Sequence, residues 1–130
     1  MASLVLPDSN FFIRSLRDGV DPFELLALHA DTTEFITCGV VIAEVTRGLR
    51  APSLRQRFER DFSYMTCIAT TANIWERTAQ LAWMLDRQGI ILHIPDLVIA
   101  ACALEADATV LTFDADLQKI PSLRVTSRLS

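Results

Sequence analysis

Short apolar segments rich in β-forming residues alternate with longer helical segments along the chain, and this alternation most constrains the fold. The expected strands cover Ser3–Leu6, Glu34–Cys38, Met65–Ala69 and Thr109–Phe113, with a last short one at Val125. The expected helices cover Asn10–Arg17, a segment opened by Asp21 and Pro22, Val40–Arg50, Ser53–Phe62, Thr71–Gln88 and Asp96–Ala106. Strands joined through helices form parallel sheets covered on both faces. The pattern therefore predicts a doubly wound α/β domain.

Length and composition favour a single domain over residues 1–130. The sequence is 51% hydrophobic and 22% charged, and no linker or repeat divides its 130 residues. Its longest apolar run, Leu97–Leu104, is far shorter than the roughly 20 residues that a membrane-spanning helix needs. The first residues carry no basic region typical of a signal peptide. We therefore expect a cytoplasmic protein without a membrane segment.

Two sets of apolar positions are predicted to lie in the core. The three cysteines are widely spaced in apolar stretches: Cys38, Cys67 and Cys102. Because they are odd in number and lack metal-ligand spacing, we expect reduced, buried thiols. The longest predicted helix carries an apolar stripe of Trp75, Ala79, Ala82 and Trp83. We expect this stripe to face the core rather than a cofactor.

Acidic residues recur where the predicted strands end. Asp8 follows the first strand, and Asp114 and Asp116 follow the strand that ends at Phe113. Glu44 lies about one turn into the helix after the second strand, and Asp96 stands at the start of the buried helix. In parallel sheets, sites form beyond the carboxyl ends of the strands, near the switch in strand order. The topology therefore predicts that the acids converge at one edge of the sheet.

Converging carboxylates repel one another unless a proton or a cation intervenes. Oxygen-only ligands favour hard ions such as Mg²⁺ or Mn²⁺, and such ions can hydrolyse a phosphodiester without a nucleophilic side chain. Each acid also has a structural alternative. Asp8 and Asp96 could cap helices, Glu44 could be solvated, and Asp114 and Asp116 could belong to a turn. The recurrence of acids at one edge favours the metal site.

Two polar residues are candidates for supporting roles. Asn10 lies two residues after Asp8 and could orient it through a hydrogen bond. Thr112 could orient Asp114 or contact a phosphate oxygen. The structural alternatives are an ordinary turn residue and an ordinary strand threonine.

These motifs resemble those of the PIN domain family, and specifically of VapC-type toxins from toxin–antitoxin pairs. LPDSNFFI is similar to the first acidic motif, led by Asp8, and VIAEVTRG to the second, with Glu44 as its acid. IPDLVIAACAL resembles the third, carried by Asp96, and LTFDADLQKIPSLRV resembles the last, with Thr112, Asp114 and Asp116. The resemblance covers nearly the whole chain and implies a three-layer α/β/α sandwich with a central, mostly parallel sheet.

The resemblance also implies an activity and partners. It implies an endoribonuclease that depends on Mg²⁺ or Mn²⁺, forms a homodimer, and is neutralised by a cognate VapB-type antitoxin. Asp8, Glu44, Asp96 and Asp114 would be the metal ligands, with Asp114 favoured over Asp116 because it is nearer the strand end. The sequence departs from the family at Gly39, where Ser or Thr is common, and at Leu117, where Phe is common.

Five arginines lie close together and form a possible RNA-binding or partner-binding patch: Arg47, Arg50, Arg55, Arg57 and Arg60. Arginine can grip RNA phosphates with two hydrogen bonds. A solvated helix face, or a surface for an acidic antitoxin tail, is the favoured alternative. The net charge of −4 argues against a protein that coats nucleic acid by bulk electrostatics.

Two other functions fit parts of the pattern. A non-catalytic PIN-fold binding module would act through RNA or antitoxin contacts alone, and a response to metal would separate it from an enzyme. A receiver-like phosphoacceptor domain would need a lysine near the last strand. The only lysine, Lys119, lies past the acidic turn, which argues against this alternative.

Overall fold

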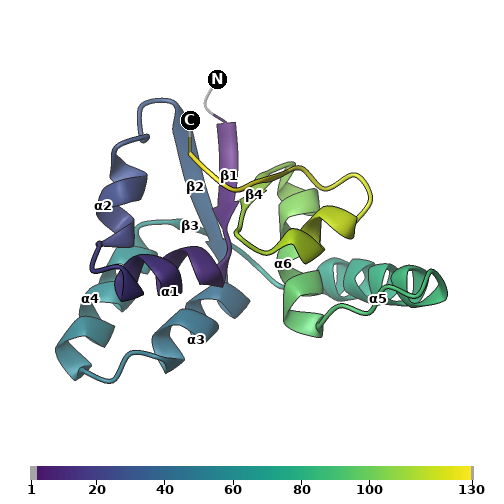
Figure 1. Cartoon of the computed structure of the whole chain (residues 1–130), viewed down its shortest axis with the longest axis horizontal. Helices are drawn as coiled ribbons and strands as arrows, with labels where there is room; N and C mark the ends of the chain where they lie inside the picture. The colour runs from purple at the N-terminus through teal and green to yellow at the C-terminus, as the bar shows by residue number, and fades with distance from the viewer. Residues whose placement is uncertain (1–2, 130) are drawn as a thin grey trace.

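The computed structural model describes residues 3–129 and contains one five-stranded sheet, in the order β3-β2-β1-β4-β5, in which all neighbouring strands are parallel (Figure 1). The strands are β1 (Ser3–Pro7), β2 (Thr33–Cys38), β3 (Thr66–Ile68), β4 (Thr109–Leu111) and β5 (Val125–Thr126). The helices are α1 (Ser9–Arg17), α2 (Pro22–Ala27), α3 (Gly39–Arg47), α4 (Pro52–Ser63), α5 (Ala72–Arg87), α6 (Ile94–Ala106) and the 3₁₀ helix η1 (Ala115–Lys119). The predicted α/β class is confirmed.

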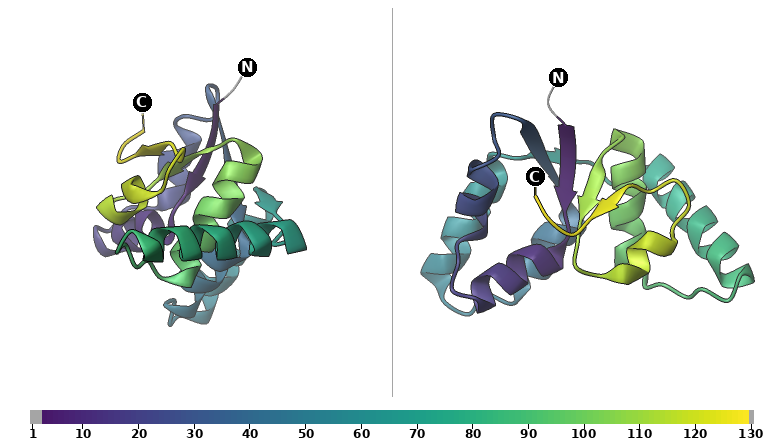
Figure 2. Two further views of the ribbon diagram at one scale, coloured as in Figure 1. Left: turned by 90° about the vertical axis from the view of Figure 1, so that its right-hand side faces the viewer. Right: turned by 45° about the horizontal axis from the view of Figure 1, so that its top comes forward.

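Helices cover both sides of the sheet. Helices α1 to α4 lie on one side, and α5 and α6 lie on the other, with α5 outermost against α6 (Figures 1 and 2). Chain order explains this division, because the first crossovers lead outward from β1 through β2 to β3, and the next returns to β4. Parallel crossovers are right-handed, so the reversal places the later helices on the opposite face. The result is the α/β/α sandwich that the resemblance implied.

The reversal also sets the position of the candidate site. The strand order changes direction between β1 and β4, which pair through Leu6 with Val110 and Pro7 with Leu111. Open parallel sheets bind ligands beyond the carboxyl ends of their strands at such a point. Both chain termini lie at the other end of the strands (Figure 1).

Buried apolar side chains fill the space between the layers. Helix α6 is buried almost all round, from Leu97 to Ala103, as its continuous apolar sequence predicts. On the opposite side, phenylalanines from three helices pack ring against ring at about 5 to 6 Å between centroids: Phe11, Phe12, Phe23, Phe58 and Phe62. This packing fixes α1, and therefore the residues at its start, against α2 and α4.

The predicted core stripe of α5 is wrong. Trp75 and Trp83 are 51% and 63% exposed, Ala79 is exposed, and Ala82 is half-buried. The buried face instead carries Ile74, Thr78, Leu81 and Leu85. The two stripes have similar helical spacing, and the packing against α6 selects the one with the branched aliphatic residues.

Several smaller expectations also change. Cys38 and Cys102 are buried free thiols as predicted, but Cys67 is exposed because β3 lies at the edge of the sheet. Helix α3 ends at Arg47 rather than Arg50, and Gly39 is its first residue rather than its cap. Within residues 3–129, no helix combines the length and the apolar character needed to span a bilayer.

Candidate active site

Asp8 occupies the turn from β1 into α1. Its backbone N–H donates to the Leu111 carbonyl at 2.8 Å, which continues the pairing of β1 with β4 by one residue. Its carboxylate caps α1, since Oδ1 accepts from the Ser9 N–H at 2.7 Å. Asp8 is only 4% exposed. The cap therefore uses only one of the two carboxylate oxygens, so capping does not exclude the predicted role in the site.

The hydroxyl of Thr112 connects the two strands at this point. It donates to Asp8 Oδ2 at 2.8 Å, and it accepts from Asn10 Nδ2 and from the Asp114 N–H, both at 3.0 Å. One donor and two acceptors use the whole hydrogen-bonding capacity of a hydroxyl. Thr112 is buried, so this network fixes Asp8 firmly. Asn10 therefore supports Asp8 through Thr112, whereas the sequence suggested a direct hydrogen bond.

Glu44 projects from the second turn of α3, half-buried beside the start of α1. Its Oε1 accepts a 2.6 Å hydrogen bond from Ser9 Oγ. Sequence reasoning missed Ser9, although a hydroxyl directly after the leading acid and at the start of a helix was the available signal. Ser9 is buried, so it holds Glu44 on the same side of the sheet as Asp8.

Asp96 lies in the first turn of α6, on the other side of the sheet. Helix α6 begins at Ile94 with His93 as its N-cap, so Asp96 is not the capping residue. Burial, followed by the negative charges of Asp8, Asp114 and Glu44, raises the pKa of Asp96 to about 6, while His93 opposes the shift. His93 is a second neighbour that sequence reasoning did not connect with the site.

Asp114 and Asp116 have different surroundings. Asp114 is half-buried, and its Oδ1 accepts from the Asp116 N–H at 2.9 Å, which fixes the turn into η1. The Asp116 carboxylate is exposed and pairs with Lys119 at 2.9 Å. Asp114 influences the pKa values of Asp8 and Asp96, whereas Asp116 is absent from both effects. Asp114 is therefore the acid that the structure brings toward the others.

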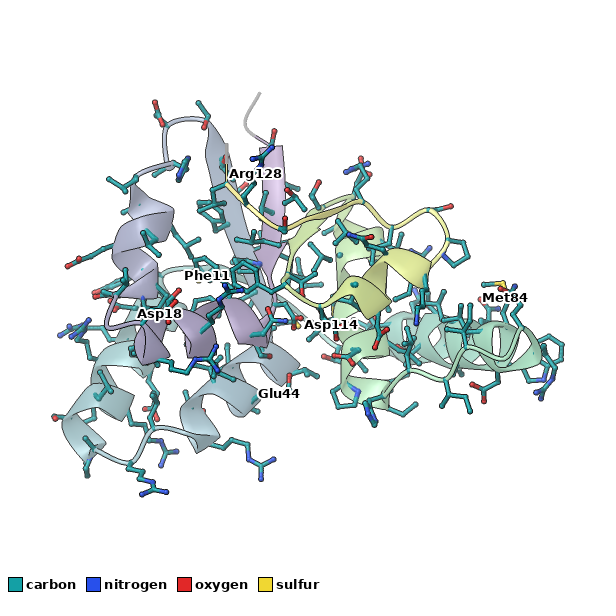
Figure 3. The ribbon with its side chains drawn as sticks, in the orientation of Figure 1. Phe11, Asp18, Glu44, Met84, Asp114 and Arg128 are labelled. Carbon is teal, nitrogen blue, oxygen red and sulfur yellow. The ribbon has the colours of Figure 1, made fainter. Side chains whose placement is uncertain are left out.

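Four carboxylates thus come together from four separate elements. Glu44 and Asp114 both lie below the lower ends of the strands, near the middle of the molecule (Figure 3). Burial raises the pKa of Asp8, two hydrogen bonds lower it, and Glu44 and Asp114 raise it again through their charges. This mutual repulsion is the electrostatic cost that a divalent cation would relieve. The oxygen-only donor set fits Mg²⁺ or Mn²⁺.

The described carboxylates are not already closed around a cation. Among residues 3–129, no three Asp, Glu, His or Cys side chains stand close enough together to hold one as they are. Like charges separate when nothing neutralises them, and Glu44 and Asp96 project from helices on side chains that can turn. The described carboxylates therefore influence one another's charge without enclosing a cation site.

The family model for the PIN domain matches residues 5–123, which include every acid described above. The chain belongs to the PIN domain family. This membership contradicts the receiver-like alternative. No curated protein has a matching sequence.

Solved structures with the same PIN fold come from toxin–antitoxin complexes. VapBC2 from Rickettsia felis, bound to a promoter DNA fragment, is 22% identical with a TM-score of 0.80, covering 95% of this chain and 97% of that one. DNA-bound VapBC from Salmonella typhimurium is 20% identical with a TM-score of 0.79, covering 97% and 98%. A toxin–antitoxin complex from Klebsiella pneumoniae is 27% identical with a TM-score of 0.72, covering 95% and 96%.

The arginine patch of this PIN domain is only partly gathered. Arg50 and Arg55 line one open hollow between the end of α3 and α4. Arg55 also pairs with Glu59 at 2.8 Å, and Arg57 pairs with Asp21, the N-cap of α2. Arg47 lies in the last turn of α3, and Arg60 in the last turn of α4. Two of the five guanidinium groups therefore have a carboxylate partner within the protein.

Proposed function

We propose that this PIN domain is an endoribonuclease that depends on Mg²⁺ or Mn²⁺ and acts as the toxin of a toxin–antitoxin pair. One observation carries the proposal. Asp8 and Asp96, which come from opposite sides of the sheet, each have a pKa raised partly by the charges of Glu44 and Asp114. Four carboxylates that share one electrostatic environment at a switch point are suited to a divalent cation.

Asp8, Glu44, Asp96 and Asp114 would hold the metal. When bound, the metal would lower the pKa of water and stabilise the charge on the departing oxygen of the phosphodiester. The protein's own residues prepare this site. Thr112 and the Ser9 N–H donate to the Asp8 carboxylate and orient it, while Ser9 Oγ directs Glu44.

Asp96 has the chemistry to exchange a proton near neutral pH. A carboxyl group with a pKa of about 6 is mostly ionised at pH 7, yet it holds a proton more readily than an ordinary aspartate. Metal binding and protonation would compete for it, since both neutralise the same charge. We therefore expect metal affinity to fall as the pH drops through 6.

The experiment is incubation of the purified protein with total cellular RNA, with Mg²⁺ and with a chelator, followed by mapping of the new RNA ends. We expect discrete new ends with Mg²⁺ and none with the chelator. Asp96→Asn is the matched control, because it removes a ligand charge with almost no change in size. Intact RNA in the presence of Mg²⁺ would favour the non-catalytic binding module instead.

Partners follow from the same proposal. The fold shared with VapBC complexes supports a VapB-type antitoxin, and cleavage of cellular RNA would place the protein in the cytoplasm.

We also propose a homodimer. The exposed Trp75 and Trp83 on the outer face of α5 support it, since large exposed aromatic side chains are typical of contact surfaces. Light scattering after gel filtration tests the homodimer, and co-expression that relieves growth arrest identifies the antitoxin.

A further inference from the structure

Phe113 lies between two residues of the proposed site, yet its side chain is partly exposed. It follows Thr112 and precedes Asp114, and it is 40% exposed. Its backbone N–H donates to Asn10 Oδ1 at 3.3 Å, so the same network that positions Asp8 also positions this residue. A partly exposed aromatic side chain beside a polar site is available for contact with a ligand.

Arg14 lies over this ring. Its guanidinium carbon is 4.4 Å from the centroid of Phe113, and the side chain comes from the last turn of α1. The ion pairs found among residues 3–129 do not include Arg14. The two residues line an open, largely apolar hollow together with Phe11, Ser15, Asp18, Val20 and Leu25. Figure 3 shows Phe11 of this hollow on the same side of the sheet as Asp18.

An aromatic ring combined with a planar cation is chemically suited to an unpaired nucleobase. Bases stack on aromatic rings and on guanidinium groups, and arginine also neutralises the neighbouring phosphate. The acidic cluster itself repels the RNA backbone, so a nearby cation and a stacking surface would hold the strand where the carboxylates cannot.

We propose that Phe113 and Arg14 form a stacking site for one unpaired base of single-stranded RNA, next to the phosphodiester that is cleaved. This inference rests on the proposed ribonuclease function and names a feature of its substrate. It predicts a requirement for an unpaired base at a fixed distance from the cut, because the ring is adjacent in sequence to Asp114. Cleavage within a continuous duplex should be poor.

Binding can be measured without cleavage in an Asp96→Asn background, using a fluorescent single-stranded RNA. We expect Phe113→Ala to weaken binding about tenfold, since stacking on an aromatic ring contributes about 1–3 kcal/mol per base. Phe113→Trp should keep the affinity. Its fluorescence should also be quenched by RNA, over the background from Trp75 and Trp83 on α5. Tyr64→Ala, which removes an aromatic side chain that is 79% exposed on α4, is the matched control and should change nothing.

Arg14→Gln separates charge from stacking. It should reduce the salt dependence of binding by about one phosphate contact, whereas Phe113→Ala should leave that dependence unchanged. Unchanged RNA affinity in Phe113→Ala would overturn the inference. So would a loss of antitoxin binding alone, because it would assign the hollow to a protein partner. If the wild-type protein leaves RNA intact, the proposed function fails; if it cleaves and Phe113→Ala cleaves equally well, only this inference fails.

Discussion

The charge of Asp8 contributes to the raised pKa of Asp96, yet the two carboxylates are held in opposite ways. Asp8 is buried at the end of β1, and two hydrogen bonds offset the effect of burial on its pKa. Asp96 lies on α6, where no described residue donates a comparable hydrogen bond, so burial and three neighbouring carboxylates raise its pKa to about 6. Hydrogen bonds therefore orient the carboxylate on the strand side of the cluster, Asp8. The negative charge on the helix side, at Asp96, instead needs a cation or a proton to neutralise it.

The largest expected effect is loss of activity when either side loses a charge. Asp8→Asn and Asp96→Asn should each lower the RNA cleavage rate by about a thousandfold, because stabilisation of the transition state by the metal amounts to several kcal/mol. Initial rates with a fluorescent oligoribonucleotide in Mg²⁺ test this. Circular dichroism should show intact folds, and near-wild-type rates in both variants would contradict the assignment of the site.

A smaller loss should follow when only the support of Asp8 is removed. Thr112→Val keeps the shape of the side chain but deletes the hydroxyl that donates to Asp8. We expect metal affinity and cleavage to fall about 10- to 100-fold, the usual cost of losing a residue that orients a ligand. Thr112→Ser is the control and should retain most activity. Equal losses in Val and Ser would indicate a packing effect.

The raised pKa of Asp96, on the helix side, should be measurable as a change in the free energy of unfolding with pH. The folded-state pKa of Asp96 lies above its ordinary value of 3.8. The contribution of Asp96 to the free energy of unfolding is therefore most favourable below about pH 4 and is lost as the pH rises through 6. In chelator at pH 7.5, Asp96→Asn should raise the free energy of unfolding by about 1–2 kcal/mol. Urea unfolding between pH 4 and 8 measures this. Mg²⁺ should restore stability to the wild-type protein only, and a flat wild-type profile would refute the account.

The smallest effect concerns a residue that we place outside the chemistry. Cys102 is fully buried in α6 against Cys38, so Cys102→Ala should cost about 1 kcal/mol of stability and leave cleavage unchanged. Thermal unfolding and initial rates measure the two quantities. A lost activity at an unchanged melting temperature would show that the thiol serves the site.

The strand side was also easier to predict than the helix side. Asp8, Thr112 and Asp114 follow strand ends, and parallel pairing of β1 with β4 brings strand ends together in any such fold. The hydrogen bond from Ser9 to Glu44 depends on how α1 packs against α3, which no local pattern encodes. The prediction of the buried face of α5 failed for the same reason. Two stripes of residues share one helical period, and only contact with α6 distinguishes the exposed Trp83 from the buried Leu81.

The pairing of Pro7 with Leu111 joins the beginning of the chain to a strand about a hundred residues later. During synthesis, Asp8 and Glu44 are made well before β4 and Asp114. A partly synthesised chain therefore cannot assemble the acidic cluster, and long-range pairing of this kind also slows folding after release. A nuclease built in this way would become active only after β4 has been made and has paired with β1.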